Sequence, residues 1–312
     1  MSKMMATRDG YGKALLELGE KNEQVVVLDA DLSKSTKTAE FGKTYPDRFF
    51  NVGIAEQNLM GLAAGLSTTG KIPFASTFAM FATGRAFEII RNSIGYPKLN
   101  VKICATHAGI TVGEDGASHQ ALEDIACMRV IPNMTVIVPS DGPEAIEAVK
   151  AAAEYYGPIY LRLGRSGVPT INDGPDYQFE IGKGVTLREG KDITIIATGI
   201  MVSEALIAAE RLKEKGIEAR VINIHTIKPL DDELIVKAAK ETGAVITAEE
   251  HNIIGGLGSA VAEVLSEKAP VPMKRIGVKD TFGESGKPKE LMEKYGLTGD
   301  EIFKASIEIL AR

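Results

Sequence analysis

Two of the chain's four histidines lie in one loop, and histidine is the side chain that most readily moves a proton near neutral pH. The loop reads THAGITVGEDGASHQ and carries His107, His119, Glu114, Asp115 and Ser118. Such a loop can present several polar groups to a small hydroxylated ligand, with histidine as a general acid or base. The alternative is a solvated loop in which Ser118 or Asp115 only caps a helix. The loop alone favours neither interpretation.

A second set of residues could supply an acid and an apolar contact surface. Glu56 opens the apolar stretch EQNLMGLAAGLS. Either an acidic side chain stabilises a helix N-terminus there, or a carboxyl group is held in a dry environment where it can share a proton. Phe78 and Phe81 are three residues apart in STFAMFATGRAFEIIR, which predicts one face of a helix. Such a pair usually packs into a core, and the alternative is a surface for the ring of a ligand.

Motifs for several other chemistries are missing from the sequence. We find no GxxxxGK[ST], GxSxG or HExxH, which argues against a phosphate-binding P-loop, a serine hydrolase with a nucleophile elbow and a zinc metalloprotease. Gly255, Gly256 and Gly258 precede a predicted helix, but Val261 stands where a dinucleotide site has its third glycine. We therefore expect a tight strand-to-helix turn at these glycines.

Composition narrows the possible partners. The 312 residues carry 36 Lys and Arg against 42 Asp and Glu, so the formal net charge of −6 disfavours general attraction to nucleic acid, although a local basic pocket can form. Cys104 and Cys127 fit neither a redox pair nor a zinc site, and we predict buried free thiols in a reducing cytoplasm. The N-terminus lacks the apolar core of a signal peptide, and no apolar run is long enough to span a membrane. We expect a cytoplasmic enzyme without membrane or nucleic acid partners.

Alternating strands and helices must position the candidate residues. We predict strands over 24–28, 48–52, 72–76, 101–106, 135–138 and 159–163 and helices over 56–67, 78–94 and 143–155. Strands that are apolar on both faces and separated by helices predict a parallel sheet covered by helices on both sides. The histidine loop would then lie at the carboxyl edge of this sheet, where open α/β sheets bind ligands.

The pattern pauses in a segment rich in Gly, Pro and Asp and then resumes. We predict further strands over 193–197, 218–224 and 244–248 and helices over 202–215, 231–242 and 258–268. The expected organisation is an α/β protein with a larger domain over 1–170, a linker over 171–190 and a smaller α/β domain over 191–312.

Taken in order along the chain, these motifs resemble those of thiamine-diphosphate enzymes, and most closely transketolase. The resemblance covers the whole chain and matches a pyrimidine-binding domain followed by a transketolase C-terminal domain. It rests on DADL at 29–32, NVGIAEQ at 51–57, ASTFAMF at 75–81, THAGITVGEDGASHQ at 106–120 and the arginine of LGRSG at 163–167.

The resemblance implies thiamine diphosphate as the cofactor, with its pyrimidine bound by this chain. Glu56 would hydrogen-bond the pyrimidine ring nitrogen and so help to activate the cofactor. Phe78 and Phe81 would form an apolar cup for the pyrimidine face. Ile54 would hold the cofactor in a bent shape, and Asp31 would lie near its thiazolium ring.

The resemblance also implies which residues would contact the substrate. His107 and Asp115 would hydrogen-bond substrate hydroxyls, and His119 would lie near the reacting carbon and move protons. The terminal phosphate of a sugar would be bound by Arg8, Ser35 and Arg165.

Two departures from the transketolase pattern stand out. Gly84 replaces a third aromatic residue, which implies a smaller cofactor cup or one completed by another chain. The diphosphate and magnesium motif, GDG followed by a distant Asn, is absent, so we expect no metal ligand on this chain. The chain therefore resembles the C-terminal subunit of a split transketolase. An N-terminal subunit would carry the missing motif and hold Mg²⁺ (or Ca²⁺), in an α2β2 heterotetramer built on a homodimer of this chain.

The implied reaction is the transfer of a two-carbon ketol unit between ketose and aldose phosphates, as in the pentose phosphate pathway. One alternative is the beta subunit of a 2-oxo acid dehydrogenase decarboxylating component, which shares the two domains and a similar Glu motif. Another is an enzyme similar to deoxyxylulose-phosphate synthase. A scaffolding homologue without catalysis is disfavoured because the chain retains Glu56, His107, Asp115 and His119.

Overall fold

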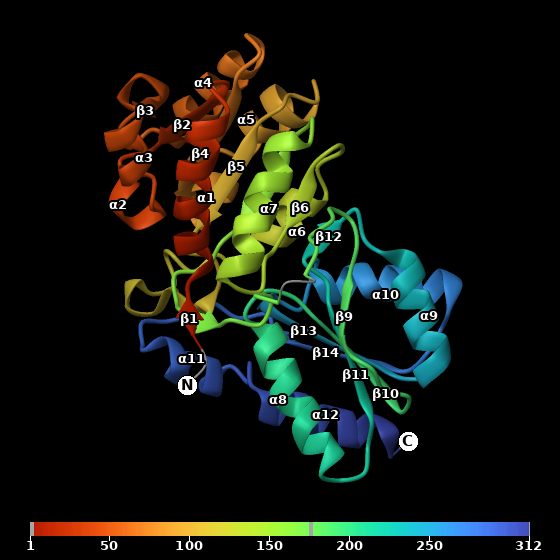
Figure 1. The fold of residues 1–312 in the computed structure, drawn as a ribbon. Coiled ribbons are helices and arrows are strands. Elements are labelled where there is room, and N and C mark those ends of the chain that lie inside the picture. The colour runs from red at the N-terminus through yellow and green to blue at the C-terminus, as the bar shows by residue number, and fades with distance from the viewer. Residues whose placement is uncertain (1–2, 175–176, 312) are drawn as a thin grey trace.

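The computed structural model describes residues 3–174 and 177–311. It contains two α/β units stacked one above the other, with the larger N-terminal unit at the top of Figure 1 and the C-terminal unit below it. The predicted fold class, a parallel-sheet domain followed by a smaller α/β domain, is confirmed. Residues 175 and 176, inside the predicted linker, lie outside the described residues.

The first unit is built on a seven-stranded sheet in the order β12-β6-β7-β5-β4-β2-β3. Six strands run parallel, and β12 pairs antiparallel with β6. Their bounds are β2 Val25–Asp29, β3 Phe49–Asn51, β4 Ile72–Phe78, β5 Lys102–Thr106, β6 Thr135–Ile137, β7 Ile159–Arg162 and β12 Thr226–Lys228.

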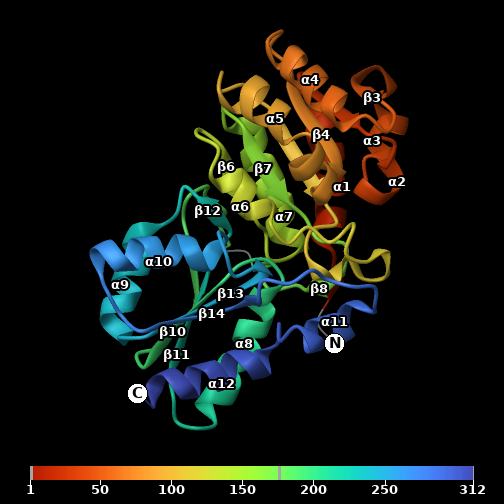
Figure 2. The same cartoon turned by 180° about the vertical axis from the view of Figure 1, so that it is seen from behind.

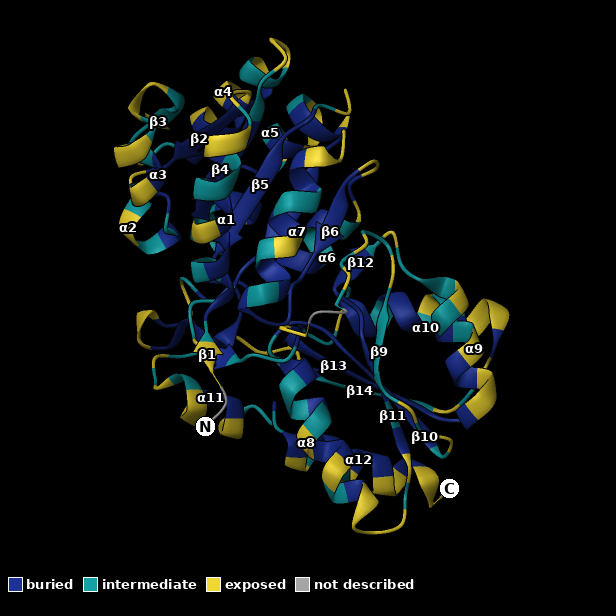
Figure 3. Ribbon diagram, viewed as in Figure 1, coloured by how far each residue is buried: buried dark blue, intermediate teal, exposed yellow. Residues whose placement is uncertain are grey.

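Helices cover both faces of this sheet (Figure 1 and Figure 2) because its strands are apolar on both sides. Along β2, Val25 and Val27 join one core cluster, while Val26 and Leu28 join another on the opposite face. The first face is covered by α1 (Thr7–Lys21), α3 (Ala39–Thr44) and α7 (Gly142–Glu154), and the second by α4 (Glu56–Ser67), α5 (Phe87–Ile89) and α6 (Asp124–Arg129). In Figure 3 the central strands are accordingly dark blue and the outer helix faces yellow.

The second unit has a five-stranded sheet in the order β14-β13-β10-β11-β9, in which only β9 is antiparallel. The strands are β9 Val185–Arg188, β10 Ile193–Ala197, β11 Ala219–Asn223, β13 Val245–Asn252 and β14 Met273–Val278. The helices that pack on it are α8 (Met201–Lys213), α9 (Asp232–Thr242), α10 (Leu257–Lys268) and α12 (Gly299–Leu310). Shorter elements complete the fold: β1 Met4–Met5, β8 Val168–Pro169, α2 Ser33–Thr36 and α11 Pro288–Lys294.

The two units are more closely joined than a linker at 171–190 suggests. Strand β9 lies inside that segment and belongs to the second sheet, while β12, from the second unit, extends the first sheet. One apolar cluster runs from Leu28 in the first unit to Ile196 and Ile222 in the second. Relative positions across the junction are therefore set by sheet pairing and core packing, and side chains from both units can contribute to one site.

Two predictions are corrected by the structure. The segment 78–94 is not one helix: Phe78 is the last residue of β4, and the segment continues as the π-helical η2 (Phe81–Arg85), α5 and the π-helical η3 (Ile90–Gly95). Strand β4 is extended because it pairs with β5 as far as Phe78. Both cysteines are free as predicted, but only Cys104 is buried, since Cys127 lies half-buried on α6.

Candidate active site

The candidate residues gather at the carboxyl edge of the first sheet, where parallel strands end side by side. Asp31 follows β2, Phe78 ends β4, His107 follows β5 and Arg165 follows β7. Arg8 comes from the first turn of α1, and this turn is tied to the end of β7 because the Gly164 N–H donates to Thr7 Oγ1 at 2.7 Å. The topology thus unites residues from distant parts of the sequence.

The Phe pair and the two loop histidines form one aromatic cluster. The rings of Phe78 and His107 stack with centroids 3.9 Å apart, and those of Phe78 and Phe81 stack at 5.8 Å. The ring of His119 meets Phe81 edge-on at 5.2 Å. Phe78 and Phe81 are therefore neighbours, as the sequence predicted, although a strand end and a π-helix bring them together. The histidine loop faces this cluster, which favours a ligand-binding loop over a merely solvated one.

His107 is held in one protonation state by its surroundings. It is 3% exposed, and Arg8 Nη1 donates to its Nε2 at 3.0 Å. Because a guanidinium has no acceptor, the ring proton must sit on Nδ1, which contacts Thr106 Oγ1 at 2.9 Å. Burial, together with the charges of Arg8 and Arg165, lowers the pKa of His107 to about 3. The imidazole therefore stays neutral under physiological conditions.

Cationic side chains converge beside this neutral imidazole. Arg8 also donates to the backbone oxygen of Ser35 at 3.0 Å. Arg165 donates to the Val112 carbonyl and to Glu114 Oε2. Lys37, the next cation, pairs with Asp9 at 3.1 Å. Several guanidinium and ammonium donors at one end of a site form a binding place for an anion such as a phosphate.

Ser35 is positioned by a buried carboxylate that the sequence analysis did not single out. Asp29, at the end of β2, accepts hydrogen bonds from Leu32 N, Thr36 Oγ1 and Thr38 Oγ1 at 2.6, 2.6 and 2.9 Å. These bonds fix the turn that carries Asp31 and Ser35. The signal in the sequence is the spacing of an Asp after an apolar strand with two threonines close behind.

Glu56 is buried, as one of its two interpretations required. It is the first residue of α4, is 1% exposed and pairs with Arg85 Nη1 at 2.7 Å. The same guanidinium lies over the Phe81 ring, 5.0 Å from its centroid. Arg85 therefore joins Glu56 to the aromatic cluster. The sequence analysis missed Arg85, which is four residues after Phe81 and thus about one helical turn away.

Asp31, Ile54 and Asp115 lie more openly at the same edge. Asp31 is exposed, has a positive φ of 64° and accepts a hydrogen bond from Asn51 Nδ2 at 3.0 Å. Ile54 precedes α4 and is 78% exposed. Asp115 is exposed at the end of the 3-10 helix η4 (Ile110–Asp115). Among the described residues, no hydrogen bond or ion pair joins these three side chains to the histidines, so their roles stay predictions.

Gly84 has a local packing partner. A Cβ added at Gly84 would lie 2.7 Å from the terminal methyl group of Met80, so a larger side chain there requires Met80 to move. Met80 thus occupies space next to the position of the third aromatic that the resemblance led us to look for. Whether the cup is smaller or is completed by another chain stays a prediction.

Over residues 3–174 and 177–311, no group of three or more His, Cys, Asp or Glu side chains is arranged to hold a metal ion. No helix there is long and apolar enough to cross a membrane. Gly255 and Gly256 lie in the predicted turn between β13 and α10, whereas Gly258 is already the second residue of α10.

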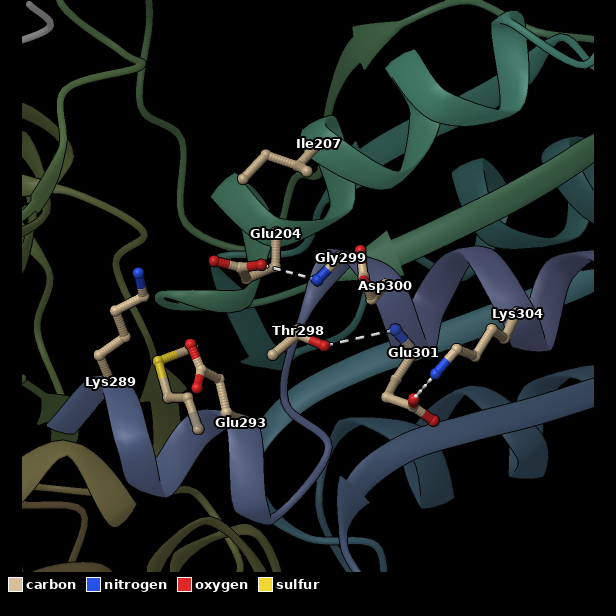
Figure 4. Close-up of a pocket in the computed structure, with 10 residues that line it drawn as sticks. Glu204, Ile207, Lys289, Glu293, Thr298, Gly299, Asp300, Glu301 and Lys304 are labelled. Atoms are coloured by element: carbon tan, nitrogen blue, oxygen red, sulfur yellow. Dashed lines mark hydrogen bonds and ion pairs between the residues drawn. The ribbon is translucent and has the colours of Figure 1, made fainter. Parts of the chain in front are cut away.

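A separate pocket in the second unit offers less chemistry (Figure 4). It has a volume of about 450 Å³ and lies between α8, α11 and the start of α12. Glu204 accepts the Gly299 N–H at 2.7 Å, and Thr298 Oγ1 accepts the Glu301 N–H at 3.3 Å. These polar groups cap the N-terminus of α12, and the aromatic and cationic cluster remains the candidate active site.

Comparisons with known proteins decide the family. The model of the transketolase pyrimidine-binding domain matches residues 3–170, and that of the transketolase C-terminal domain matches residues 182–302. This chain belongs to the transketolase family. Membership implies the use of thiamine diphosphate, and the predicted resemblance is confirmed.

Several relatives match this chain over nearly its whole length and over nearly the whole of their own length. A putative transketolase C-terminal section of Methanocaldococcus jannaschii is 58% identical over 96% of this chain and 95% of its own. A 6-deoxy-6-sulfo-D-fructose transketolase subunit of Clostridium sp. is 46% identical over 98% of this chain and 94% of its own length. A solved structure, a split gene transketolase in an inactive beta4 tetramer, is 63% identical to this chain. It superposes with a TM-score of 0.92 over 98% of this chain and 99% of its own. The chain is thus similar to separately encoded C-terminal sections.

The residues present fit the pyrimidine end of thiamine diphosphate. Phe78 and Phe81 offer adjacent aromatic faces, and the buried Glu56 carboxyl is linked to the same cluster through Arg85. An apolar surface beside a buried carboxyl suits a flat heterocycle with a basic ring nitrogen. The cationic groups near His107 suit a second, anionic molecule instead.

Proposed function

We propose that this chain is the C-terminal subunit of a two-subunit transketolase that transfers a two-carbon ketol unit between ketose and aldose phosphates. The observation that carries the proposal is the cluster in which Phe78 and His107 stack at 3.9 Å while Arg8 contacts His107 at 3.0 Å. In this cluster an aromatic surface that suits a cofactor ring lies beside cations that suit a phosphate, and this arrangement supports the proposal. The family match supports the same reaction class.

In this proposal bound thiamine diphosphate supplies the carbon nucleophile, and the chain's residues bind, orient and move protons. Glu56 holds a proton at the pyrimidine ring nitrogen, and Phe78 and Phe81 contact the ring face. By the resemblance, Ile54 would help to orient the bound cofactor, and Asp31 would lie toward its thiazolium end.

The substrate residues follow from the charges at the site. Arg8 and Arg165 bind the phosphate through paired N–H groups, and Ser35 lies beside them. His107, which stays neutral, accepts a hydrogen bond from a sugar hydroxyl at Nε2 once Arg8 turns from that atom to the phosphate, and Asp115 accepts another. His119, whose ring meets Phe81 edge-on, transfers protons at the reacting carbon.

The proposal includes an N-terminal partner subunit that carries the GDG…N motif and holds Mg²⁺ or Ca²⁺, in an α2β2 assembly. It is supported by the absence of that motif from this sequence and by the similar split gene transketolase, which forms an inactive beta4 tetramer. The pentose phosphate pathway and a cytoplasmic location remain predictions. The Clostridium relative is named for a sulfo-sugar, so the anion on the preferred sugar is part of what must be tested.

The test is purification from the native host followed by assay. We expect a companion chain with GDG…N to co-purify, and the complex to convert xylulose 5-phosphate and ribose 5-phosphate. Glu56→Ala should lower this activity by about 10²-fold or more, because it removes the proton-holding group. Activity with pyruvate and an artificial electron acceptor instead would favour the 2-oxo acid dehydrogenase alternative. Full activity of this chain alone would refute the split assignment.

A further inference from the structure

The histidine loop depends on contacts from the second unit. Its backbone has positive φ at His107, Gly109, Gly113 and Gly116, and the 3-10 helix η4 within it is interrupted at Gly113, so hydrogen bonds inside the loop hold only part of its shape. The Thr111 N–H, in the first turn of η4, donates to Glu250 Oε1 at 2.7 Å. Glu250 belongs to β13, in the sheet of the second unit.

The approach of Glu250 to the loop is close enough to restrict the loop's sequence. A Cβ at Gly109 would lie 2.3 Å from the carboxyl carbon of Glu250 and within 2.5 Å of both its oxygens. A side chain at Gly109 would therefore push the loop and the carboxylate apart. Gly109 also has a φ of 86°, which an L-residue adopts only with strain.

The strand that carries Glu250 is anchored to the first unit. Arg162, at the end of β7, pairs with Asp124 at 2.7 Å and donates to the backbone oxygen of Glu250 at 2.9 Å. All three residues are buried. The backbone of Glu250 is thus fixed relative to the first unit, and this holds its carboxylate in a defined position beside the loop.

A second contact holds the other end of the loop. Gln120 Nε2 donates to the Ile110 carbonyl at 3.1 Å and to the Glu284 carbonyl at 2.9 Å. Glu284 follows β14 in the second unit. The loop is therefore held on both sides of Asp115 by residues from outside its own unit.

We propose that Glu250 is a positioning residue through which the second domain sets the geometry of the loop that carries His107 and Asp115, and so sets the affinity for the sugar phosphate. The inference rests on the proposed function and adds a role for the C-terminal domain, to which the sequence analysis assigned no chemistry. Glu250 acts through Thr111 and does not itself contact the substrate.

The neighbouring Glu249 provides a matched control. It is equally buried, but successive residues of a strand point to opposite faces. Its carboxylate accepts the Leu257 and Gly258 N–H groups at 2.7 and 2.8 Å, at the start of α10. Glu249→Ala therefore removes buried hydrogen bonds within the second unit without touching the histidine loop.

The experiment compares Glu250→Ala, Glu250→Gln and Glu249→Ala in the complex with the N-terminal subunit. We expect Glu250→Ala to raise KM for the sugar phosphate about tenfold, the equivalent of one lost buried hydrogen bond, with a smaller change in kcat. Glu250→Gln keeps an acceptor oxygen and should restore KM. Glu249→Ala should lower the melting temperature but leave KM unchanged. Equal KM for Glu250→Ala and the wild type, or an equal rise in Glu249→Ala, would overturn the proposal.

A second readout needs neither partner nor activity. In the full chain, hydrogen exchange of the peptide around Thr111 should accelerate in Glu250→Ala and not in Glu249→Ala. If Glu250→Ala fails to fold, Gly109→Ala perturbs the same contact from the loop side and should give the same exchange and KM changes. An inactive wild-type complex would refute the proposed function, whereas unchanged exchange around Thr111 in these variants would refute the positioning role.

Discussion

Replacing His107 with glutamine should change how the stability of this chain responds to acid. The ring is buried, stacked on Phe78 and hydrogen-bonded to Arg8 at 3.0 Å. Protonation of Nε2 would break the contact with Arg8 and place two cations side by side. Glutamine keeps an acceptor oxygen for Arg8 but cannot be protonated, so it isolates the contribution of the ring's titration.

The magnitude follows from the two protonation equilibria. Burial and the charges of Arg8 and Arg165 lower the pKa of His107 to about 3 in the folded chain. An unfolded histidine has a pKa of about 6.5, so between these values only the unfolded chain takes up the proton. The free energy of unfolding is therefore unaffected above about pH 6.5 and falls as the pH drops below it. At pH 5, roughly 1.5 units lower, the loss is about 2 kcal/mol at about 1.36 kcal/mol per unit.

The assay is urea denaturation of the chain at about pH 7.5 and pH 5, at one protein concentration so that self-association contributes equally. Between these values the wild type should lose about 2 kcal/mol more than His107→Gln. Burial also lowers the pKa of His225, to about 4, but His225 titrates in both proteins and cancels from the difference. Equal losses in the two proteins would show that His107 is not held neutral and would refute the reasoning.

Three ion pairs give further predictions. Arg85→Met leaves the Glu56 carboxylate buried without its 2.7 Å partner and should cost about 1–3 kcal/mol in urea denaturation. Glu56→Gln in the same chain should recover most of that loss, and additive effects of the two changes would contradict the pairing. Asp124→Ala leaves the buried Arg162 guanidinium without its carboxylate partner and should lower the free energy of unfolding by about 3–5 kcal/mol. Glu17→Gln, in a more exposed pair with Lys150, should cost at most about 1 kcal/mol, and equal losses in these two variants would contradict the role of burial.

Much of the architecture could be predicted because its signals are local. Apolar runs separated by amphipathic segments gave six parallel strands, and the predicted helix at 56–67 coincides with α4. The strands β9 and β12 were missed because each is short and pairs outside its neighbourhood in the sequence. The residues of β12, Thr226–Lys228, join a strand about 90 positions earlier, and nothing in those three residues indicates that partner.

In the site, too, the residues with local signals could be predicted and those that depend on distant partners could not. The histidine loop and the Phe pair could be found from residue type and spacing, and they lie together. Arg85 and Glu250 could not be found, because an arginine on a helix and a glutamate in AEEHN are ordinary residues until their partners are known. The helix predicted over 78–94 failed at Phe78 since pairing with β5 outweighs local periodicity.

In the proposed function, the cations around His107 would let a chain with a net charge of −6 bind an anion. Arg8, Arg165, His119 and Lys37 all disfavour a charge on the imidazole, so the local potential at His107 is positive. A phosphate placed there would attract the Arg8 guanidinium, whose Nη1 otherwise contacts His107 Nε2 at 3.0 Å. That movement would free Nε2 to accept a sugar hydroxyl. In the proposed function, one arginine would then couple recognition of the phosphate to recognition of the hydroxyl, which would favour a phosphorylated sugar over a free one.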